Sequence, residues 1–346
     1  MSLQGSITPV DSGLTQHGEG SGKAPRKLIM LLTSAGRRVG LLQCFRYAAA
    51  QLGLELVIFA CDLQPDLSAA CQLADGSFAV PPADDTGYAD RVFALCVETG
   101  ATLVVPTIDT ELLALAAERD RFENAGIRIS ISSLELIEIA RDKLKTAEFL
   151  SARDIPIPLT CSLEVVVASG WTGDWPVMVK PRHGSSSRGI QIARKPSDLP
   201  HTPAEPMIVQ ELLQGAEYTV NMYFDRDAGL RAAVPHERLQ VRAGEVEKGV
   251  TRRNLELEQL ARDLAVCLPK PRGALCFQAM RDARGIAKIF EINPRFGGGY
   301  PLADQAGAPF ARWLLEECAG LPSTASNEWR DGLAMLRFDA AIYLDP

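Results

Sequence analysis

The chain has 346 residues, of which 47% are hydrophobic and 23% are charged. This length predicts two or three domains, and the composition is that of an ordinary globular protein. The net charge of −7 argues against a broad nucleic-acid-binding surface, and no apolar stretch reaches the 18 residues or so that indicate a membrane span.

Residues 1–27 are rich in Gly, Ser, Thr, Gln and Pro and show no periodicity, which predicts a flexible tail. The apolar run at 28–32 is too short for the core of a signal peptide. The eight cysteines include no Cys-x-x-Cys pair, and most lie within apolar runs. We therefore predict reduced thiols and a cytoplasmic protein, rather than a disulfide or metal framework.

Short apolar runs alternate with amphipathic helical segments between residues 28 and 130. The runs are KLIMLLT, ELVIFACD, ATLVVPT and GIRISI. This order predicts βαβ units, a parallel sheet and a Rossmann-like domain. Ligands of such sheets bind beyond the carboxyl ends of the strands, which here carry residues 33–38, Asp62 and residues 107–111. The first of these loops lacks G-x-G-x-x-G, which argues against an NAD site.

The pattern changes after residue 130. A helical segment at 133–152 leads through Pro156 and Pro158 into a region of strands with few helices. The expected strands are 176–180, 189–193, 207–211, 216–224, 230–235, 246–250, 273–281 and 286–292. Helices are expected at 254–267 and between 301 and 319. This part therefore predicts an α+β fold with mainly antiparallel pairing.

The stretch KIFEINPRFGGGYP at 288–301 places polar side chains at the end of an apolar strand. Glu291 and Asn293 are two residues apart and share a face of that strand. If a two-residue turn at Arg284-Gly285 joins it to the preceding strand, Gln278 lies opposite Glu291. Three oxygen ligands with one formal charge suit a Mg²⁺ ion that also binds phosphate. The alternative is a polar strand end that faces water.

Arg295 follows the metal-ligand candidates by two residues. A guanidinium beside a metal–phosphate site stabilises charge that develops during phosphoryl transfer. Residues 297–299 are three glycines, which let backbone amides approach a substrate or form a simple turn, and we take Gly298 as a candidate substrate contact.

The stretch PVMVKPRHGSSSRGIQIA at 176–193 places Lys180 at the end of a strand before a small, polar loop. We expect Lys180 to bind a phosphate and the loop to fold over phosphates as a flap. The flap candidates are Gly184, Ser185, Ser186, Ser187, Arg188 and Gly189. The loop is not a Walker A motif, and a surface hairpin with a solvated lysine is the alternative.

A third stretch, IVQELLQGAEYTV at 208–220, is a strand that ends in a bend at Gln214-Gly215. Backbone groups at Glu211–Leu213 are candidates to bind adenine, and Glu217 is a candidate for ribose hydroxyls.

The three stretches in this order resemble the ATP-grasp superfamily, most closely carbamoyl-phosphate-synthase-large-subunit-like proteins with one ATP-grasp half and small amino-acid ligases. The resemblance covers about residues 28–320. It implies that DKLKTAEFL carries a first ATP-binding lysine at Lys143. It also places the second lysine at Lys180, the metal ligands at Gln278, Glu291 and Asn293, and the catalytic cation at Arg295.

The implied architecture is a tail at 1–27, a Rossmann-like pre-ATP-grasp domain at 28–130 and a two-lobed ATP-grasp fold. The small lobe with the flap is expected at 131–206 and the large lobe with the metal site at 207–346. One ATP-grasp half argues against complete carbamoyl phosphate synthesis. The serines of the flap also depart from the glycine of many relatives.

The resemblance implies a carboxylate–amine ligase that uses ATP and Mg²⁺ or Mn²⁺, forms an acyl phosphate and releases ADP and phosphate. Phosphorylation of bicarbonate or carbamate and a non-catalytic ATP-binding module are the alternatives. Small carboxylates and amines are the expected partners, with no nucleic acid or membrane and with a homodimer left open. Further candidate substrate residues are Ser34, Arg37, Asp109, Glu111, Arg238 and Lys248.

Overall fold

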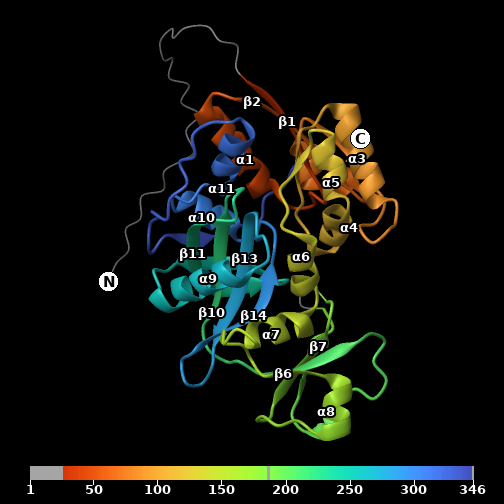
Figure 1. Ribbon diagram of the computed structural model, residues 1–346, viewed down its shortest axis with the longest axis vertical. Helices are drawn as coiled ribbons and strands as arrows, with labels where there is room; N and C mark the ends of the chain where they lie inside the picture. Colours follow the sequence, from red (N-terminus) through yellow and green to blue (C-terminus); the bar gives the residue numbers. More distant parts are fainter. Residues whose placement is uncertain (1–25, 185–187, 345–346) are drawn as a thin grey trace.

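The computed structural model describes residues 26–184 and 188–344. Three parts follow one another along its long axis: an N-terminal domain, a large antiparallel sheet with its helices, and a small lobe (Figure 1). The predicted tail at 1–27 lies almost wholly outside the described residues. No helix within the described ranges is long and apolar enough to cross a membrane.

The N-terminal domain confirms the Rossmann-like prediction. Its five strands are all parallel and are ordered β3-β2-β1-β4-β5. They are β1 Lys27–Leu32, β2 Glu55–Asp62, β3 Gly76–Ala79, β4 Leu103–Val105 and β5 Arg128–Ile129. The helices are α1 Val39–Leu52, α2 Ala69–Leu73, α3 Tyr88–Thr99, α4 Leu112–Ala117 and α5 Arg119–Asn124, with 3₁₀ turns η1 Pro65–Leu67 and η2 Asp109–Glu111. Helices α6 Leu134–Arg141 and α7 Lys143–Ser151 lead into the rest of the chain.

The large lobe is built on a six-stranded sheet, ordered β14-β13-β10-β11-β12-β15, in which every pair is antiparallel. Its strands are β10 Glu217–Phe224, β11 Leu230–Arg242, β12 Glu245–Thr251, β13 Gly273–Arg281, β14 Ala287–Asn293 and β15 Ala334–Leu336. Its helices are α9 Leu255–Cys267, α10 Tyr300–Gln305 and α11 Phe310–Cys318. Helix α9 packs on one face of the sheet, and α10 and α11 pack on the other.

The small lobe holds a four-stranded sheet in the order β6-β9-β7-β8. Its elements are β6 Thr160–Ser162, α8 Leu163–Ser169, β7 Val177–Pro181, β8 Gln191–Ala193, η3 Pro196–Asp198 and β9 Met207–Glu211. Strand β9 therefore belongs to this lobe, although the sequence placed it at the start of the large lobe. Strand β9 lies between β6 and β7 and is antiparallel to both. A local sequence pattern does not reveal which strands will pair, so the sequence could not assign β9 to this sheet.

The predicted pairing of Gln278 with Glu291 is present, but it arises differently. The turn contains three residues rather than two, with Gly285 at φ +83° and its amide donating to the Asp282 carbonyl over 2.9 Å. This turn alone would shift the register by one residue. A bulge at Phe290 restores it, so that Gln278 again faces Glu291.

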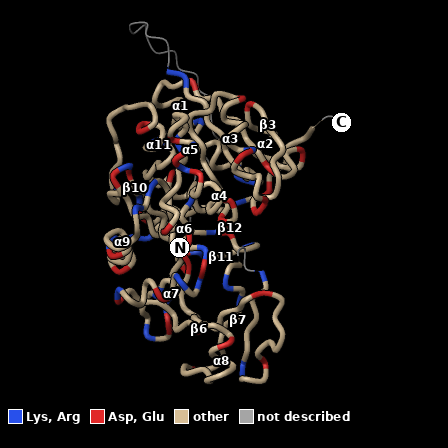
Figure 2. The backbone as a smooth tube through the Cα atoms, turned by 45° about the vertical axis from the view of Figure 1, so that its right-hand side comes forward, with Lys and Arg blue, Asp and Glu red and all other residues tan. Residues whose placement is uncertain are grey.

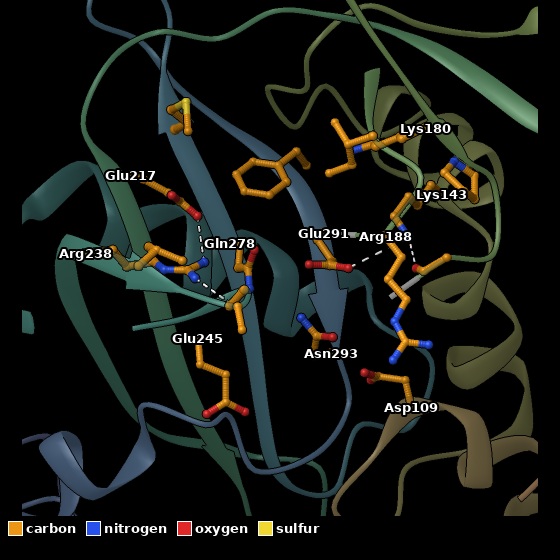
Figure 3. A pocket seen from close by; sticks show the side chains of 18 of the residues that line it. Asp109, Lys143, Lys180, Arg188, Glu217, Arg238, Glu245, Gln278, Glu291 and Asn293 are labelled. Carbon is orange, nitrogen blue, oxygen red and sulfur yellow. Dashed lines mark hydrogen bonds and ion pairs between the residues drawn. The ribbon is translucent and has the colours of Figure 1, made fainter. Parts of the chain in front are cut away.

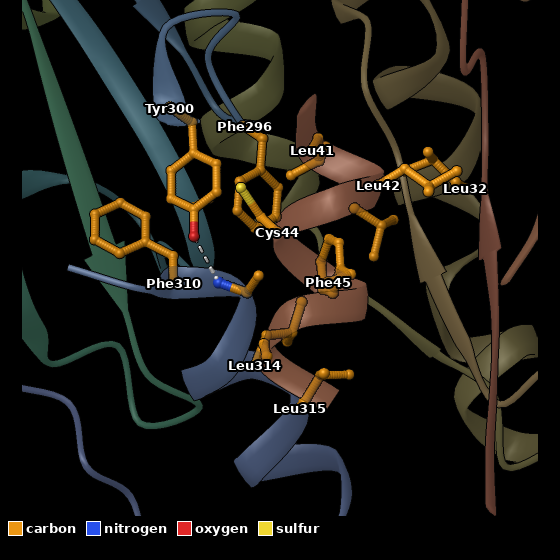
Figure 4. Close-up of a cluster of buried hydrophobic side chains, with 14 of the residues drawn as sticks. Leu32, Leu41, Leu42, Cys44, Phe45, Phe296, Tyr300, Phe310, Leu314 and Leu315 are labelled. Carbon is orange, nitrogen blue, oxygen red and sulfur yellow. Dashed lines mark hydrogen bonds between the residues drawn. The ribbon is translucent and has the colours of Figure 1, made fainter. Parts of the chain in front are cut away.

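One hydrophobic cluster joins the N-terminal domain to the large lobe (Figure 4). Phe45 of α1 meets Phe296 edge-on at a ring distance of 5.7 Å, and Phe296 meets Tyr300 at 4.8 Å. The Tyr300 hydroxyl accepts a hydrogen bond from the Ala311 amide over 2.9 Å. The segment that follows Arg295 is therefore packed directly against the first helix of the other domain.

Candidate active site

A cavity of about 500 Å³ lies where the N-terminal domain, the large lobe and the small lobe meet (Figure 3). Figure 2 shows Lys and Arg positions along the backbone around β11 and toward the small lobe. The basic residues among the described lining are Arg37, Arg38, Lys143, Lys180, Arg188, Arg238 and Arg295. The acidic ones are Asp109, Glu211, Glu217, Glu245 and Glu291. The excess of basic side chains favours an anionic ligand.

The three candidate metal ligands line this cavity together. Gln278 comes from β13, and Glu291 and Asn293 come from β14. Ile292, between the last two, points to the opposite face and is buried in the core against α9. Strand alternation therefore places the carboxylate and amide oxygens on the cavity side, as predicted.

Lys143 is the first residue of α7 and is positioned by the residue before it. Asp142 caps this helix by accepting hydrogen bonds from the Leu144 and Lys145 amides over 3.0 and 3.2 Å. The same carboxylate binds Arg182 at 2.7–2.8 Å. Lys143 Nζ lies 3.8 Å from Glu291 Oε1 and donates to the Gly184 carbonyl. The lysine thus connects the metal-ligand strand to the base of the flap.

Lys180 is buried at the end of β7, with only 5% of its surface exposed. The alternative of a solvated surface hairpin is therefore wrong for this residue. Burial, reinforced by Lys143 and opposed by Glu291, lowers the pKa of Lys180 to about 8. A desolvated ammonium group with no carboxylate within 4 Å in the described residues is suited to bind a phosphate.

This pKa predicts a pH-dependent affinity for ATP. We expect affinity to fall as the pH rises from 7.5 to 9.5, by at most about tenfold per unit, because Lys180 loses its charge. Lys180→Arg should remove the dependence and Lys180→Ala should weaken binding at every pH, as measured by calorimetric titration. An affinity that is independent of pH in the unmodified protein would contradict the assignment.

Since an unfolded lysine titrates near 10.4, Lys180 also makes the free energy of unfolding rise with pH between about 8 and 10.4.

Arg295 is held in a buried ion pair. Its Nη2 atom donates to Asp109 Oδ2 over 2.6 Å and to Asn293 Oδ1 over 3.1 Å. Burial has the largest single effect and acts to lower the pKa of Arg295, but Asp109, Cys276 and Glu291 together raise this pKa above the ordinary arginine range. Arg295 is therefore a fixed, permanently charged group beside the metal-ligand strand.

The adenine–ribose candidates lie at the junction of the two lobes. Glu211, Leu213 and Glu217 all line the cavity. Both oxygens of Glu211 accept from Lys288 over 2.7 Å, so its side chain is already occupied. Glu217 accepts from Arg238 over 2.6 Å, and burial raises the pKa of Glu217 although Arg238 opposes this.

Apolar side chains also line the cavity, among them Met178, Ile190, Leu213, Met280 and Phe290. They give the cavity apolar lining of the kind that suits a flat heterocycle. Sequence reasoning missed four of them because each reads as an ordinary strand residue; Leu213 had been predicted. From the flap, Gly184 and Arg188 line the cavity, whereas Gly189 does not. Ser185, Ser186 and Ser187 lie outside the described residues.

The structure divides the candidate substrate residues. Arg37, Asp109 and Arg238 line the large cavity. Lys248 does not, because it is exposed on β12 where it pairs with Gln240. Ser34 is also absent from the lining and donates to Glu111 over 3.0 Å.

Glu111 is a structural residue rather than a substrate contact. It is fully buried and accepts hydrogen bonds from the Thr107 and Ile108 amides over 2.7 and 3.0 Å. The Tyr88 hydroxyl also donates to it. Burial raises the pKa of this carboxyl. Its role is to hold the loop after β4.

Gly298 is explained by close packing rather than by substrate contact alone. A Cβ atom there would lie 2.6 Å from the Glu245 carboxylate, so any other residue would force Glu245 to move away from its partners. Glu245 binds Arg38 over 2.7 Å and Arg337 over 3.0 Å, which together hold its pKa below the usual range against the effect of burial. Arg337 also donates to the Gly298 carbonyl. Glu245 was missed because its partners lie far away in the sequence.

Comparisons with known proteins match two parts of the chain to domain families. Residues 140–299 match the ATP-grasp domain family, and residues 30–130 match the family described as PylC-like, N-terminal domain. No curated protein shows significant sequence similarity to the chain.

Several solved structures share the fold. The biotin carboxylase domain of Hydrogenobacter thermophilus 2-oxoglutarate carboxylase is 18% identical, with a TM-score of 0.69 over 88% of this chain and 73% of that one. N5-carboxyaminoimidazole ribonucleotide synthetase from Thermotoga maritima is also 18% identical, with a TM-score of 0.66 over 87% of this chain and 78% of that one. L-amino acid ligase from Bacillus licheniformis is 16% identical, with a TM-score of 0.66 over 89% of this chain and 78% of that one.

The structure thus has a Rossmann-like N-terminal domain followed by a two-lobed fold that contains the region matched by the ATP-grasp domain family. Residues 140–299 belong to the ATP-grasp domain family, and a PylC-like N-terminal domain precedes them.

Proposed function

We propose that the protein is an ATP-dependent carboxylate–amine ligase that works through an acyl phosphate and releases ADP and phosphate. The observation that carries the proposal is the convergence of Lys143, Lys180 and Arg295 with the Gln278–Glu291–Asn293 set on one cavity. These groups come from helix α7, the small lobe and the large lobe, and only the folded chain brings them together.

ATP would lie between the lobes, with its adenine on the apolar surface near Met178 and Phe290 and its phosphates near Lys143 and Lys180. The donor set of one carboxylate and two amide oxygens fits a hard cation such as Mg²⁺ or Mn²⁺ that also takes phosphate oxygens. Such an ion, held by Gln278, Glu291 and Asn293, would neutralise charge on the phosphates.

Arg295 would act where the carboxylate meets the γ-phosphate. Its fixed charge would stabilise the phosphoryl group during transfer, and then the oxyanion formed when the amine attacks the acyl phosphate. Because every group is held in place beforehand, positioning and electrostatics would provide most of the catalysis.

Phosphorylation of bicarbonate or carbamate is a second candidate. A recess of about 60 Å³ beside the large cavity is lined by Arg238, Gln278, Asn293 and Arg295, among others. This volume corresponds to about two water molecules, which suits a small oxyanion. The solved biotin carboxylase domain was crystallised with bicarbonate, which supports this candidate without excluding a larger carboxylate. A non-catalytic module is disfavoured because a pure binder need not retain Arg295.

We expect ATP and the correct carboxylate to form an acyl phosphate before any amine is present. Hydroxylamine should intercept it as a hydroxamate, with ADP as the coproduct. The measurement is hydroxamate and ADP formation across a panel of amino acids, small carboxylates and bicarbonate.

Stimulation of ADP release by bicarbonate alone would favour the second candidate. AMP and pyrophosphate as products would contradict the acyl-phosphate scheme. Binding of ATP without turnover across the whole panel would support the non-catalytic module.

A further inference from the structure

Asp109, in the loop after β4, is the one ion-pair partner of Arg295 among the described residues. Both side chains are 13% exposed, and they come from positions 186 residues apart, in different domains. Loss of one member of such a pair leaves the other charge buried without a partner. In Figure 3 Asp109 lies in the same cavity as Asn293, on the side of the N-terminal domain.

The other hydrogen bonds of Arg295 are local. Asn293 precedes it by two residues, and Nη1 donates to the carbonyl of the adjacent Phe296 over 3.0 Å. These partners belong to the same segment and move with the arginine. The Nε atom has no partner in the described residues. Asp109 is therefore the contact that fixes the guanidinium relative to a separate part of the molecule.

Asp109 is itself held in place. It begins the 3₁₀ turn η2, and the last residue of that turn is the buried Glu111. Glu111 accepts hydrogen bonds from the two amides that precede Asp109, those of Thr107 and Ile108. The buried Glu111 carboxylate thus fixes the loop that carries Asp109, whose side chain lines the cavity.

We propose that Asp109 is a positioning residue that orients Arg295 for catalysis from the N-terminal domain, rather than a substrate-binding residue. This inference rests on the proposed function of Arg295. The Oδ2 atom of Asp109 accepts a hydrogen bond from the guanidinium over 2.6 Å, so this oxygen is engaged by Arg295. The N-terminal domain therefore contributes to the chemistry through Arg295.

The test compares Asp109→Ala and Asp109→Asn by ADP release at saturating ATP and carboxylate. Asp109→Ala should lower kcat by about 10²-fold, the scale of a small misplacement of a catalytic group. Asp109→Asn should lose less, because its amide oxygen can still accept from Arg295. Both should leave the affinity for ATP unchanged. Asp120→Asn, an exposed carboxylate of α5, is the matched control and should behave like the unmodified protein.

A double-mutant cycle separates positioning from an independent role. If Asp109 acts through Arg295, Asp109→Ala combined with Arg295→Met should be no slower than Arg295→Met alone. Additive losses, an unchanged kcat in Asp109→Ala, or a loss confined to KM would overturn the proposal.

Failure of the proposed function would appear in the unmodified protein itself, as an absence of hydroxamate. The same cycle would then be measured on the free energy of unfolding. Coupling between the two substitutions would support the role of Asp109 in holding Arg295, and additive effects would overturn it.

Discussion

Arg295→Met is expected to lower kcat by about 10³-fold while the affinity for ATP stays close to that of the unmodified protein. The nucleotide phosphates are expected to contact Lys143 and Lys180, whereas Arg295 acts on charge that develops only during transfer. kcat and kcat/KM should fall together, the pattern of an interaction made only in the transition state. Steady-state ADP release and calorimetric titration with ATP measure the two quantities.

The ion pair with Asp109 requires a further control, because Arg295→Met leaves a buried carboxylate unpaired. Asp109→Asn combined with Arg295→Met removes that charge and should restore stability without restoring kcat. Arg226→Met, a substitution of the same type at a side chain that is 68% exposed, should leave activity unchanged. If Arg295→Met raises KM and leaves kcat unchanged, Arg295 has a role in substrate binding rather than in catalysis.

Glu291→Gln is expected to reduce turnover by about 10²-fold or more and to shift its midpoint to higher Mg²⁺ concentration. Glu291 carries the one formal charge of the Gln278–Glu291–Asn293 set, so the amide would weaken the hold on a divalent cation. The measurement is turnover against free Mg²⁺ at fixed ATP.

Glu138→Gln on the exposed side of α6 is the matched control. Because Glu291 also lies 3.8 Å from Lys143, the affinity for ATP without metal should be measured in parallel. Turnover that is unchanged at limiting Mg²⁺ would remove Glu291 from the metal site.

The parts of the site that could be predicted are those in which chemistry and secondary structure coincide locally. Glu291 and Asn293 share a strand face because of alternation, and Gln278 is on the adjacent strand of a hairpin. That pairing was correct although the predicted turn was one residue too short, because the bulge at Phe290 compensated. A bulge has no reliable signal in a single sequence, so register predicted from a turn is correct only when such deviations cancel.

What could not be predicted depends on contacts between distant segments. Asp109 and Glu111 are two residues apart and both carry a carboxyl group, yet Asp109 lines the cavity and Glu111 is fully buried. Glu245 meets Arg38 across 207 residues of sequence. Strand β9 joined the small lobe for the same kind of reason, since its partners are chosen by tertiary packing.

The hydrophobic cluster around Phe45, Phe296 and Tyr300 bears on how the protein unfolds and on which part of it can move. A chain divided near residue 130 would expose apolar surface on both fragments, so we expect the N-terminal domain and the large lobe to unfold as one cooperative unit. The small lobe has a separate core, built from residues such as Val177, Val179 and Val209. We therefore expect that opening for nucleotide exchange moves the small lobe, whereas Asp109 and Arg295 keep their relative positions.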